Sequence, residues 1–237
     1  MELEPLGFIE SCYNEKFGTP RQSGLVTESE GHLQIFSKFQ PELALEGLER
    51  FSHVWLIWGF HKNENLRYHP KVHPPRLSGQ SIGVFATRSP HRPNPLGLSL
   101  VKLTRVEAPR LYFQGLDLIQ GTPIYDIKPY LPELESQPRA QGGWVDHVQN
   151  NPITVTFSPE SQAFLTDWSL RNNHKIIHGL IQQTIALDPR PLVYRGFEGE
   201  ADSPYRQTHV FSLFDLDIEF EFLDKTQALV RLVRTKI

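Results

Sequence analysis

Residues 83–97 hold the side chains best suited to bind an anion. They read GVFATRSPHRPNPLG and include two arginines, Arg88 and Arg92, with a histidine, an asparagine and three prolines. Because each proline fixes its backbone φ angle, the loop has little conformational entropy to lose when it binds a ligand. A guanidinium group binds a carboxylate or phosphate through two parallel hydrogen bonds. A proline-rich surface turn is the alternative, but two arginines in so stiff a loop favour an anion-binding site.

A second candidate site lies in residues 121–130, GTPIYDIKPY. If this segment is extended, Asp126 and Lys128 lie on one face, and Tyr125 and Ile127 on the other. The aspartate could accept hydrogen bonds from an amine, and the lysine could hold a carboxylate or a phosphate. An ordinary surface ion pair explains the two charges equally well, so the chemistry alone leaves both interpretations open.

Two weaker signals accompany these segments. The loop at residues 17–25, FGTPRQSGL, places an arginine and a glutamine between glycines, and His61 and Lys62 follow an apolar run. The sequence has no GxGxxG after a strand, no GxxxxGK[ST], no HExxH and no GxSxG. Dinucleotide-binding folds, P-loop nucleoside triphosphatases, zinc peptidases and α/β-hydrolases therefore lack sequence support.

The charge distribution is more informative than the net charge of −3. Residues 61–110 contain nine Lys or Arg and two Glu, which gives this stretch a net charge of about +7. A local basic field can attract a polyanion even when the whole molecule is acidic. A solvated loop with scattered charge is the alternative interpretation.

The composition indicates a globular cytoplasmic protein. Hydrophobic residues make up 39% and charged residues 22% of the 237 residues. No run of about 18 apolar residues could span a bilayer, and the start of the chain lacks the features of a signal peptide. Cys12 is the only cysteine, so the chain cannot form an internal disulfide or a zinc site made of thiolates, and we expect no metal.

Hydrophobic patterning predicts mainly β structure over the first two thirds of the chain. Polar, glycine and proline clusters separate seven short candidate strands, at residues 6–11, 33–36, 53–60, 81–87, 97–106, 111–118 and 124–127. Several are too apolar throughout to have a solvated face, which suits either a closed single-sheet β-barrel or a sheet covered on both sides. One helix is predicted at residues 41–51, with Pro41 in its first turn and Gly47 weakening it. We place this domain at residues 1–154.

The remainder, residues 155–237, predicts a small α+β domain. Ser158 and Pro159 suit the start of a helix that runs to about residue 170, and a second helix covers residues 175–187. Residues 216–222 alternate apolar and acidic side chains, as does a strand with one buried face, and residues 229–233 form a last strand. A solvated acidic face explains this alternation better than a metal site.

Three of these segments, residues 17–22, 83–94 and 121–130, together resemble one family, the TrmO (YaeB, TsaA-like) tRNA methyltransferases. The resemblance covers residues 3–150 in order, and the C-terminal part is similar to that of the bacterial members. It implies a β-barrel methyltransferase that uses S-adenosyl-L-methionine, forms a homodimer and holds its cofactor near the subunit interface. The implied reaction is methylation of N6 of N6-threonylcarbamoyladenosine next to the anticodon of threonine tRNA.

The resemblance also implies which residues contact the cofactor, and the chemistry of the remaining motif residues suggests further roles. The cofactor contacts carried over by motif are Pro20, Arg21, Gln22, His61, Lys62, Arg92, Lys102, Thr122, Pro123, Ile124 and Tyr125. We expect Asp126 to be the catalytic base or to orient the nitrogen. The residues expected to bind the substrate carboxylate or tRNA phosphates are Arg67, Tyr68, Lys71, Arg76, Arg88 and Lys128.

Two other classes of protein compete with this interpretation. A non-catalytic RNA-binding or regulatory β-barrel module explains the basic stretch and the barrel equally well. It does not explain why the arginine-rich loop and the GTPIYD segment occur together, and cofactor binding distinguishes the two. A hydrolase that uses Asp126 and a histidine lacks a nucleophile.

Overall fold

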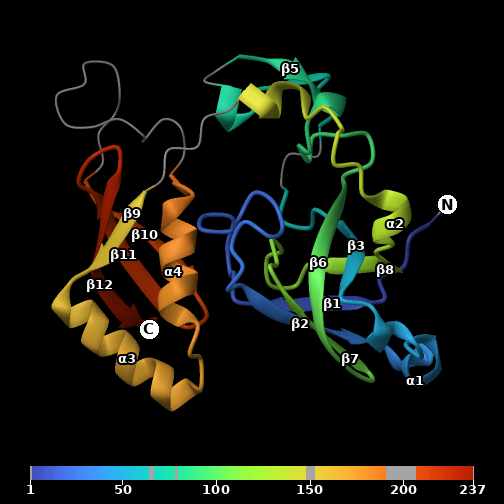
Figure 1. Cartoon of the computed structure of the whole chain (residues 1–237), viewed down its shortest axis with the longest axis horizontal. Helices are drawn as coiled ribbons and strands as arrows, with labels where there is room; N and C mark the ends of the chain where they lie inside the picture. The colour runs from blue at the N-terminus through green and yellow to red at the C-terminus, as the bar shows by residue number, and fades with distance from the viewer. Residues whose placement is uncertain (1, 64–66, 78–79, 148–152, 191–206, 237) are drawn as a thin grey trace. The chain divides into compact units, whose positions relative to one another are not determined.

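A closed β-barrel forms the first half of the structure. The computed structural model describes residues 2–63, 67–77, 80–147, 153–190 and 207–236. The barrel strands follow the order β1-β2-β7-β6-β3-β8 (Figure 1). Their bounds are β1 Gly7–Ser11, β2 Glu30–Ile35, β3 His53–Gly59, β6 Leu96–Glu107, β7 Arg110–Gln114 and β8 Pro123–Pro129. The prediction of a mainly β fold with a closed barrel is confirmed.

The barrel wall has a buried and a partly exposed face even where its sequence is apolar throughout. In β3, Val54 and Leu56 are fully buried, whereas Trp55 and Ile57 are only half-buried. In β6 every second residue from Gly97 to Leu103 is buried. No residue of β3 is exposed, so the expectation that such a strand has no solvated face holds for β3, although period-two alternation persists beneath its uniform hydrophobicity.

Two elements differ from their predictions. The strand expected at residues 81–87 is only β5 Ile82–Gly83, which pairs with β4 Lys71–Val72 and leads into the 3₁₀ helix η4 Val84–Ala86. The Thr87 backbone N–H and hydroxyl both bond the Val84 carbonyl and close that turn. The helix expected at residues 41–51 is interrupted at Gly47, whose φ is +87°. What forms is α1 Pro41–Ala44 and η2 Leu48–Arg50.

Short helices occupy the remaining connections of this part. They are η1 Ser37–Phe39, η3 Pro75–Leu77, α2 Pro132–Glu135 and η5 Gly143–His147. Over the described residues no helix is both long and apolar enough to cross a membrane.

A four-stranded sheet and two helices form the α+β part that the sequence predicts. The strand order is β10-β11-β12-β9, with β9 parallel to β12 and the other pairs antiparallel. The bounds are β9 Thr154–Phe157, α3 Pro159–Asn172, α4 Ile177–Ala186, β10 His209–Leu213, β11 Leu216–Phe222 and β12 Gln227–Thr235. Patterning predicted both helices and β11 but missed β9 and β10. Ser158 caps α3 as expected, because its Oγ accepts the backbone N–H of Ser161 at 3.1 Å.

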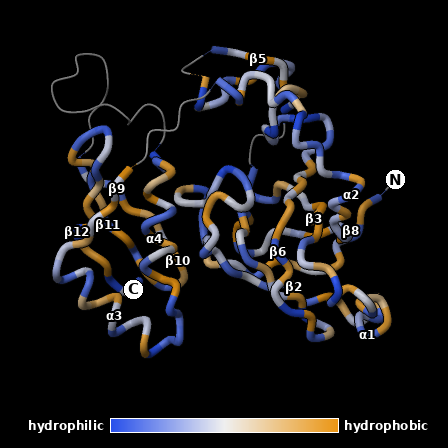
Figure 2. The backbone as a smooth tube through the Cα atoms, in the orientation of Figure 1, coloured by the Kyte–Doolittle hydropathy of each residue, from blue (hydrophilic) through white to orange (hydrophobic). Residues whose placement is uncertain are grey.

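The chain divides into two compact units that interleave along the sequence. The first contains Met1–Ile9, Leu33–Tyr112 and Thr122–Asn150, and the second contains Glu10–His32, Phe113–Gly121 and Asn151–Ile237. The core of the second unit joins these segments: Cys12, Tyr13 and Val26 pack in one apolar cluster with residues of α4 and the sheet. Figure 2 shows the hydrophobic residues along β10 and β11.

Two of the three acidic side chains of β11, Asp217 and Glu221, have partners. Asp217 Oδ1 accepts a hydrogen bond from Ser212 Oγ at 2.7 Å, and Glu221 forms an ion pair with Arg231 at 3.1 Å. The apolar residues between them, from Leu216 to Phe222, are buried. The strand therefore presents a polar face opposite its buried one.

Candidate functional site

The arginine loop, residues 84–95, is folded around its own second arginine. The Arg92 guanidinium donates to the Thr87 carbonyl at 2.7 Å and to the Val84 carbonyl at 3.3 Å. It also lies 5.4 Å from the centroid of the Phe85 ring. Among the described residues of this loop only Val84 is fully buried. Hydrogen bonds, rather than a hydrophobic core, therefore give the loop its shape.

A short hairpin supports the arginine loop. Lys71 of β4 pairs with Gly83 of β5, and the Pro70 carbonyl accepts the N–H of Val84 at 3.0 Å. The His69 N–H bonds the His91 carbonyl at 3.2 Å, and the two imidazole rings meet edge to face at 4.9 Å. These bonds hold residues 69–72 beside the loop that carries both arginines.

The structure thereby gathers most of the predicted substrate-binding residues in one region of the first unit. Arg67, Tyr68, Lys71 and Arg88 are exposed and Arg76 is half-buried. Lys128 lies elsewhere, on β8, opposite Trp55 of β3.

A β-bulge on β8 sets the position of Tyr125. Ile57 of β3 pairs with Asp126 and Trp58 pairs with Ile124, so Tyr125 is the extra residue between them. Its ring lies against Gly59, where an added Cβ would come within 2.8 Å of Tyr125 Cε2. Glycine at residue 59 is therefore required for this position of the tyrosine ring.

The end of β3 brings three of the predicted cofactor segments together. His61 and Lys62 follow it and are exposed, and the Phe60 N–H bonds the Pro95 carbonyl of the arginine loop at 3.3 Å. Gly59 also pairs with Leu96 directly after that loop. The Tyr125 bulge, the His61–Lys62 pair and the arginine loop thus meet at one end of one strand.

Aromatic packing reinforces this strand end. The Trp58 indole lies over Gly97, where an added Cβ would come within 2.1 Å of Trp58 Cε2. Trp58 Nε1 donates to Ser99 Oγ at 3.0 Å, and the Trp58 and Phe60 rings lie 4.4 Å apart. Sequence reasoning missed Trp58, Gly59 and Gly97, although a glycine at the end of β3 and another at the second position of β6 were a detectable signal of close packing.

Two further groups of predicted cofactor residues lie in the first unit. Thr122, Pro123 and Ile124 are buried, and the carbonyls of Thr122 and Ile124 accept backbone N–H groups from Ile9 and Leu6. Lys102 pairs with His53 at the other end of β3, six residues along β6 from Leu96. At the usual rise of a strand that separation is about 20 Å, so the structure does not bring Lys102 to the Tyr125 end.

The loop that contains Pro20, Arg21 and Gln22 belongs to the second unit. Pro20 is buried, Arg21 is exposed, and Gln22 Nε2 donates to Ser23 Oγ at 3.4 Å. Gly18 has a φ of +89°, and an added Cβ there would come within 2.7 Å of the Phe211 ring. This close approach anchors the loop within its own unit.

Asp126 and Lys128 point the same way, as the alternation of an extended strand predicts. Lys128 Nζ lies 2.9 Å from Asp126 Oδ2, and Asp126 Oδ1 accepts the N–H of Ile127 at 2.9 Å. Both side chains are substantially exposed, so an incoming group can reach the carboxylate.

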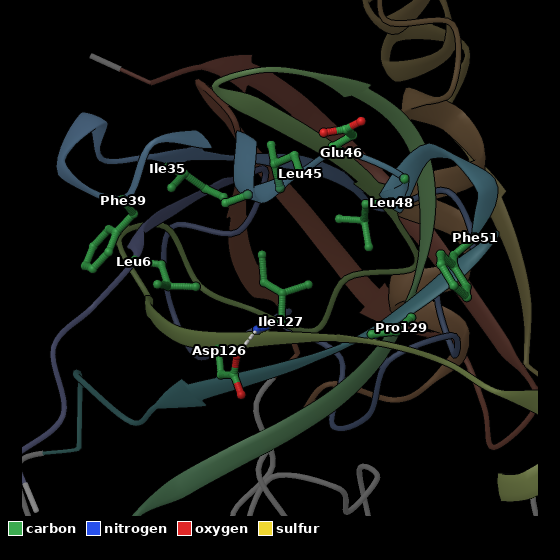
Figure 3. Close-up of a pocket in the computed structure, with 12 residues that line it drawn as sticks. Leu6, Ile35, Phe39, Leu45, Glu46, Leu48, Phe51, Asp126, Ile127 and Pro129 are labelled. Atoms are coloured by element: carbon green, nitrogen blue, oxygen red, sulfur yellow. Dashed lines mark hydrogen bonds between the residues drawn. The ribbon is translucent and has the colours of Figure 1, made fainter. Parts of the chain in front are cut away.

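A largely apolar cavity of about 460 Å³ lies beside this part of β8. Figure 3 shows Ile127 pointing towards Leu45 and Leu48, whereas the carboxylate of Asp126 points away from them. Leu6, Ile35 and Phe39 also line the cavity. The carboxylate is therefore not directed into this cavity.

Cys12 does not act as a nucleophile in this fold. It is fully buried, and burial raises the pKa of its thiol to about 12. The reactive thiolate is thus almost absent at neutral pH. In the part of the chain that the structure describes, no three His, Cys, Asp or Glu residues are grouped to hold a metal ion.

Comparison with known families matches nearly the whole chain. A model of the tRNA-methyltransferase O N-terminal domain matches residues 8–136, and a model of the TrmO C-terminal domain matches residues 150–235. The tRNA (adenine(37)-N6)-methyltransferase of Escherichia coli (strain K12) is 37% identical over 228 residues, which cover 94% of each chain. A putative S-adenosylmethionine-dependent methyltransferase RcsF of Pseudomonas aeruginosa is 40% identical over 221 residues, 93% of this chain and 92% of the relative.

Mammalian relatives are longer than this chain. The tRNA (adenine(37)-N6)-methyltransferase of Rattus norvegicus is 52% identical over 135 residues, which are 56% of this chain and 31% of the relative. The chain thus matches about a third of that protein. A crystal structure of TrmO from Pseudomonas aeruginosa superposes with a TM-score of 0.79 at 33% identity, covering 99% of this chain and 98% of that one. From the matching family models, the relatives of similar length and the shared fold, we conclude that this chain belongs to the tRNA-methyltransferase O (TrmO) family.

Proposed function

We propose that the chain is an S-adenosyl-L-methionine-dependent tRNA methyltransferase that methylates N6 of N6-threonylcarbamoyladenosine next to the anticodon of threonine tRNA. The observation that carries the reaction is the 37% identity, over 94% of both chains, to a relative named tRNA (adenine(37)-N6)-methyltransferase. The Pseudomonas relative is named S-adenosylmethionine-dependent, and a Pyrococcus abyssi relative 37% identical over 144 residues is named a probable S-adenosyl-L-methionine-binding protein.

The residues at the end of β3 fit such a cofactor. The cofactor presents an aromatic base, a carboxylate and positively charged groups, and supplies an activated methyl group when bound. Tyr125 is held by its bulge and by Gly59, and offers an aromatic ring. His61, Lys62 and Arg92 offer donors for the carboxylate. Thr122 and Ile124 are fixed by backbone bonds to Ile9 of β1 and to Leu6 directly before that strand, which gives the site a rigid floor.

We assign the proton chemistry to Asp126. The attacking N6 must lose a proton, and Asp126 Oδ2 accepts it or orients the nitrogen. In the free protein Lys128 holds this carboxylate at 2.9 Å. The main task of the other residues is to align the two reactants, because no covalent nucleophile is required.

The motif segments contain more cationic side chains than the cofactor carboxylate requires. We take this excess as support for a substrate with a threonylcarbamoyl group. The substrate's threonyl group carries its own carboxylate. Arg88 and Lys128 are exposed and are not among the expected cofactor contacts, so we assign one of them to that carboxylate.

We also propose that the hairpin beside the arginine loop contacts tRNA phosphates. Between Glu64 and Glu107 the sequence contains no acidic residue. Arg67, Tyr68 and Lys71 are exposed there, and Arg76 is half-buried. The double variant Lys71→Glu, Arg76→Glu should weaken tRNA binding and reduce its salt dependence, because phosphate contacts release counterions. The matched variant Arg105→Glu, Arg110→Glu on the barrel should change both far less, and equal effects would remove the assignment.

A homodimer is the assembly that we propose. Leu96 and Leu98 of β6 are 38% and 48% exposed, side by side on one face of the strand. Covering them with a second copy would remove apolar surface from water. Leu98→Glu should shift the sedimentation coefficient to that of a monomer, whereas a wild-type monomer at micromolar concentration contradicts the proposal.

We propose that residues 1–154 carry cofactor binding and catalysis and that residues 155–237 form most of a small α+β domain, to whose core the first part of the chain adds Cys12, Tyr13 and Val26. We place the protein in the cytoplasm, where its substrate tRNA is found and where the buried thiol of Cys12 stays reduced.

Calorimetric titration with S-adenosyl-L-methionine tests the proposal. Wild type should bind, Arg92→Ala should lose most of the affinity, and Arg105→Ala should retain it. No binding to wild type, with or without tRNA, would leave a non-catalytic RNA-binding module as the better account.

A further inference from the structure

Residues 137–149 lie between the two matched family domains, where we expect only a linker. The described part, residues 137–147, is named the tether here. It contains the 3₁₀ helix η5 and belongs to the same compact unit as the arginine loop. Within the tether, Trp144 Nε1 donates a hydrogen bond to the Ala86 carbonyl at 2.8 Å.

A hydrogen-bonded turn within the tether sets the position of Trp144. Asp146 Oδ2 accepts the N–H of Gly142 at 2.7 Å, and an added Cβ at Gly142 would come within 2.1 Å of Asp146 Oδ1. Gly143 has a φ of +62°, in the left-handed region that favours glycine. Two adjacent glycines and one carboxylate thus fix the backbone immediately before Trp144.

The bond to Ala86 adds a donor from outside the arginine loop to those that hold η4. The last carbonyls of a short helix have no partners within the helix and need donors from elsewhere. Arg92 donates to the carbonyls of Val84 and Thr87, and Trp144 donates to the carbonyl of Ala86 between them. Arg92 of the same loop and Trp144 of the tether therefore bind three of the four carbonyls that precede Arg88.

We propose that Trp144 is a positioning residue for the arginine loop, and that the tether is part of the anion-binding site. Trp144 acts through the Ala86 carbonyl and holds the backbone from which Arg88 extends. The consequence for catalysis rests on the proposed function, whereas the docking of the tether does not.

The docking is tested without any substrate. Trp144→Phe removes the indole N–H and keeps an aromatic ring. In ¹H–¹⁵N spectra the Trp144 indole N–H should exchange slowly with solvent, and Trp144→Phe should shift the amides of Thr87 and Arg88. Trp55→Phe is the matched control, since Trp55 Nε1 donates to Glu135 Oε1 at 3.0 Å in the same unit. A fast-exchanging indole N–H, or Thr87 and Arg88 amides unchanged by Trp144→Phe, overturns the inference.

The positioning role is tested by steady-state methylation of tRNA. Trp144→Phe should raise KM for tRNA by roughly 3- to 10-fold, the range expected for one lost neutral hydrogen bond, with kcat within about twofold of wild type. In the background of Arg88→Ala the same change should have no further effect, because the two residues act as one unit. Equal losses in both backgrounds would make Trp144 merely structural.

Gly142→Ala provides a second variant that displaces the tether without touching the tryptophan. It should reproduce the raised KM with a melting temperature close to that of wild type, and a normal KM overturns the role of the turn. If wild type itself methylates no tRNA, the proposed function fails, and the spectra still decide whether the tether docks.

Discussion

The arginine loop and the core of the second unit are held together by different forces. In the second unit Phe211, Phe220, Leu180 and Ile181 are fully buried in one apolar cluster. In the arginine loop only Val84 is buried among the described residues, and side-chain donors to backbone carbonyls maintain its shape. The stability of the second unit resides in its packed core, whereas the loop presents charged groups on a scaffold that buries little.

The comparison implies that core truncation affects stability more than any change near the loop. Phe220→Ala should lower the free energy of unfolding by about 3–5 kcal/mol, the cost of emptying a packed aromatic site. Urea unfolding followed by tryptophan fluorescence measures the change. Val210→Ala, at an exposed position on the neighbouring strand, should cost far less. A loss below about 1 kcal/mol for Phe220→Ala would contradict the contrast between the two regions.

Gly59→Ala tests how tightly the strand end is built. The new Cβ would meet the Tyr125 ring at 2.8 Å, so overpacking should cost about 1–3 kcal/mol and lower the affinity for S-adenosyl-L-methionine. An added Cβ at Gly83 meets nothing within 4 Å, so Gly83→Ala should leave the unfolding free energy nearly unchanged. Equal stability of the two variants in urea would show that the ring moves aside freely.

Ser158→Ala probes the local signal that predicted α3. The hydroxyl accepts the N–H of Ser161 and donates to the Arg231 carbonyl at 2.8 Å, so its loss should cost about 1 kcal/mol. Thr166→Ala on the same helix should cost less, because its hydroxyl only bonds the Gln162 carbonyl one turn back. A larger loss for Thr166→Ala would contradict the capping role.

The smallest expected effect concerns the pH dependence of stability. Partial burial lowers the pKa of His178 below its usual value near 6.5. The unfolded chain therefore binds more protons than the folded one as the pH falls below 6.5, and folding loses stability in that range. His178→Gln should flatten the dependence slightly between pH 7 and pH 5, and solvent screening keeps the change small. A steeper dependence in the variant, measured by urea titration at each pH, would reverse the sign of the argument.

Sequence patterns predicted those helices and strands that are determined by residues close together in the sequence. Ser158 and Pro159 marked the start of α3, and strict alternation marked β11, because caps and periodicity act over a few residues. β9 escaped prediction because it forms only by pairing with β12, with Thr154 opposite Gln227 far along the chain. The membership of Cys12 and Tyr13 in the second unit escaped for the same reason, since only tertiary packing defines it.

The candidate site shows the same division. Motifs marked the arginine loop and the GTPIYD segment, because charged side chains in stiff loops are visible in sequence. The contacts that shape them are not, as the Trp144–Ala86 bond spans 58 residues and the Trp58–Ser99 bond spans 41. The position of Arg92 was also not predictable, because its bonds to the Val84 and Thr87 carbonyls depend on a 3₁₀ helix in place of the expected strand.

The central claim is methyl transfer to N6 of a threonylcarbamoylated adenosine, and nucleoside mass spectrometry tests it most directly. Purified protein, S-adenosyl-L-methionine and threonine tRNA with the threonylcarbamoyl group should yield the N6-methylated nucleoside. The same tRNA without that group should yield little, and Asp126→Asn should slow the reaction with cofactor binding intact. Equal methylation of both tRNAs would contradict the assigned substrate, and no methylated nucleoside from either would contradict the function.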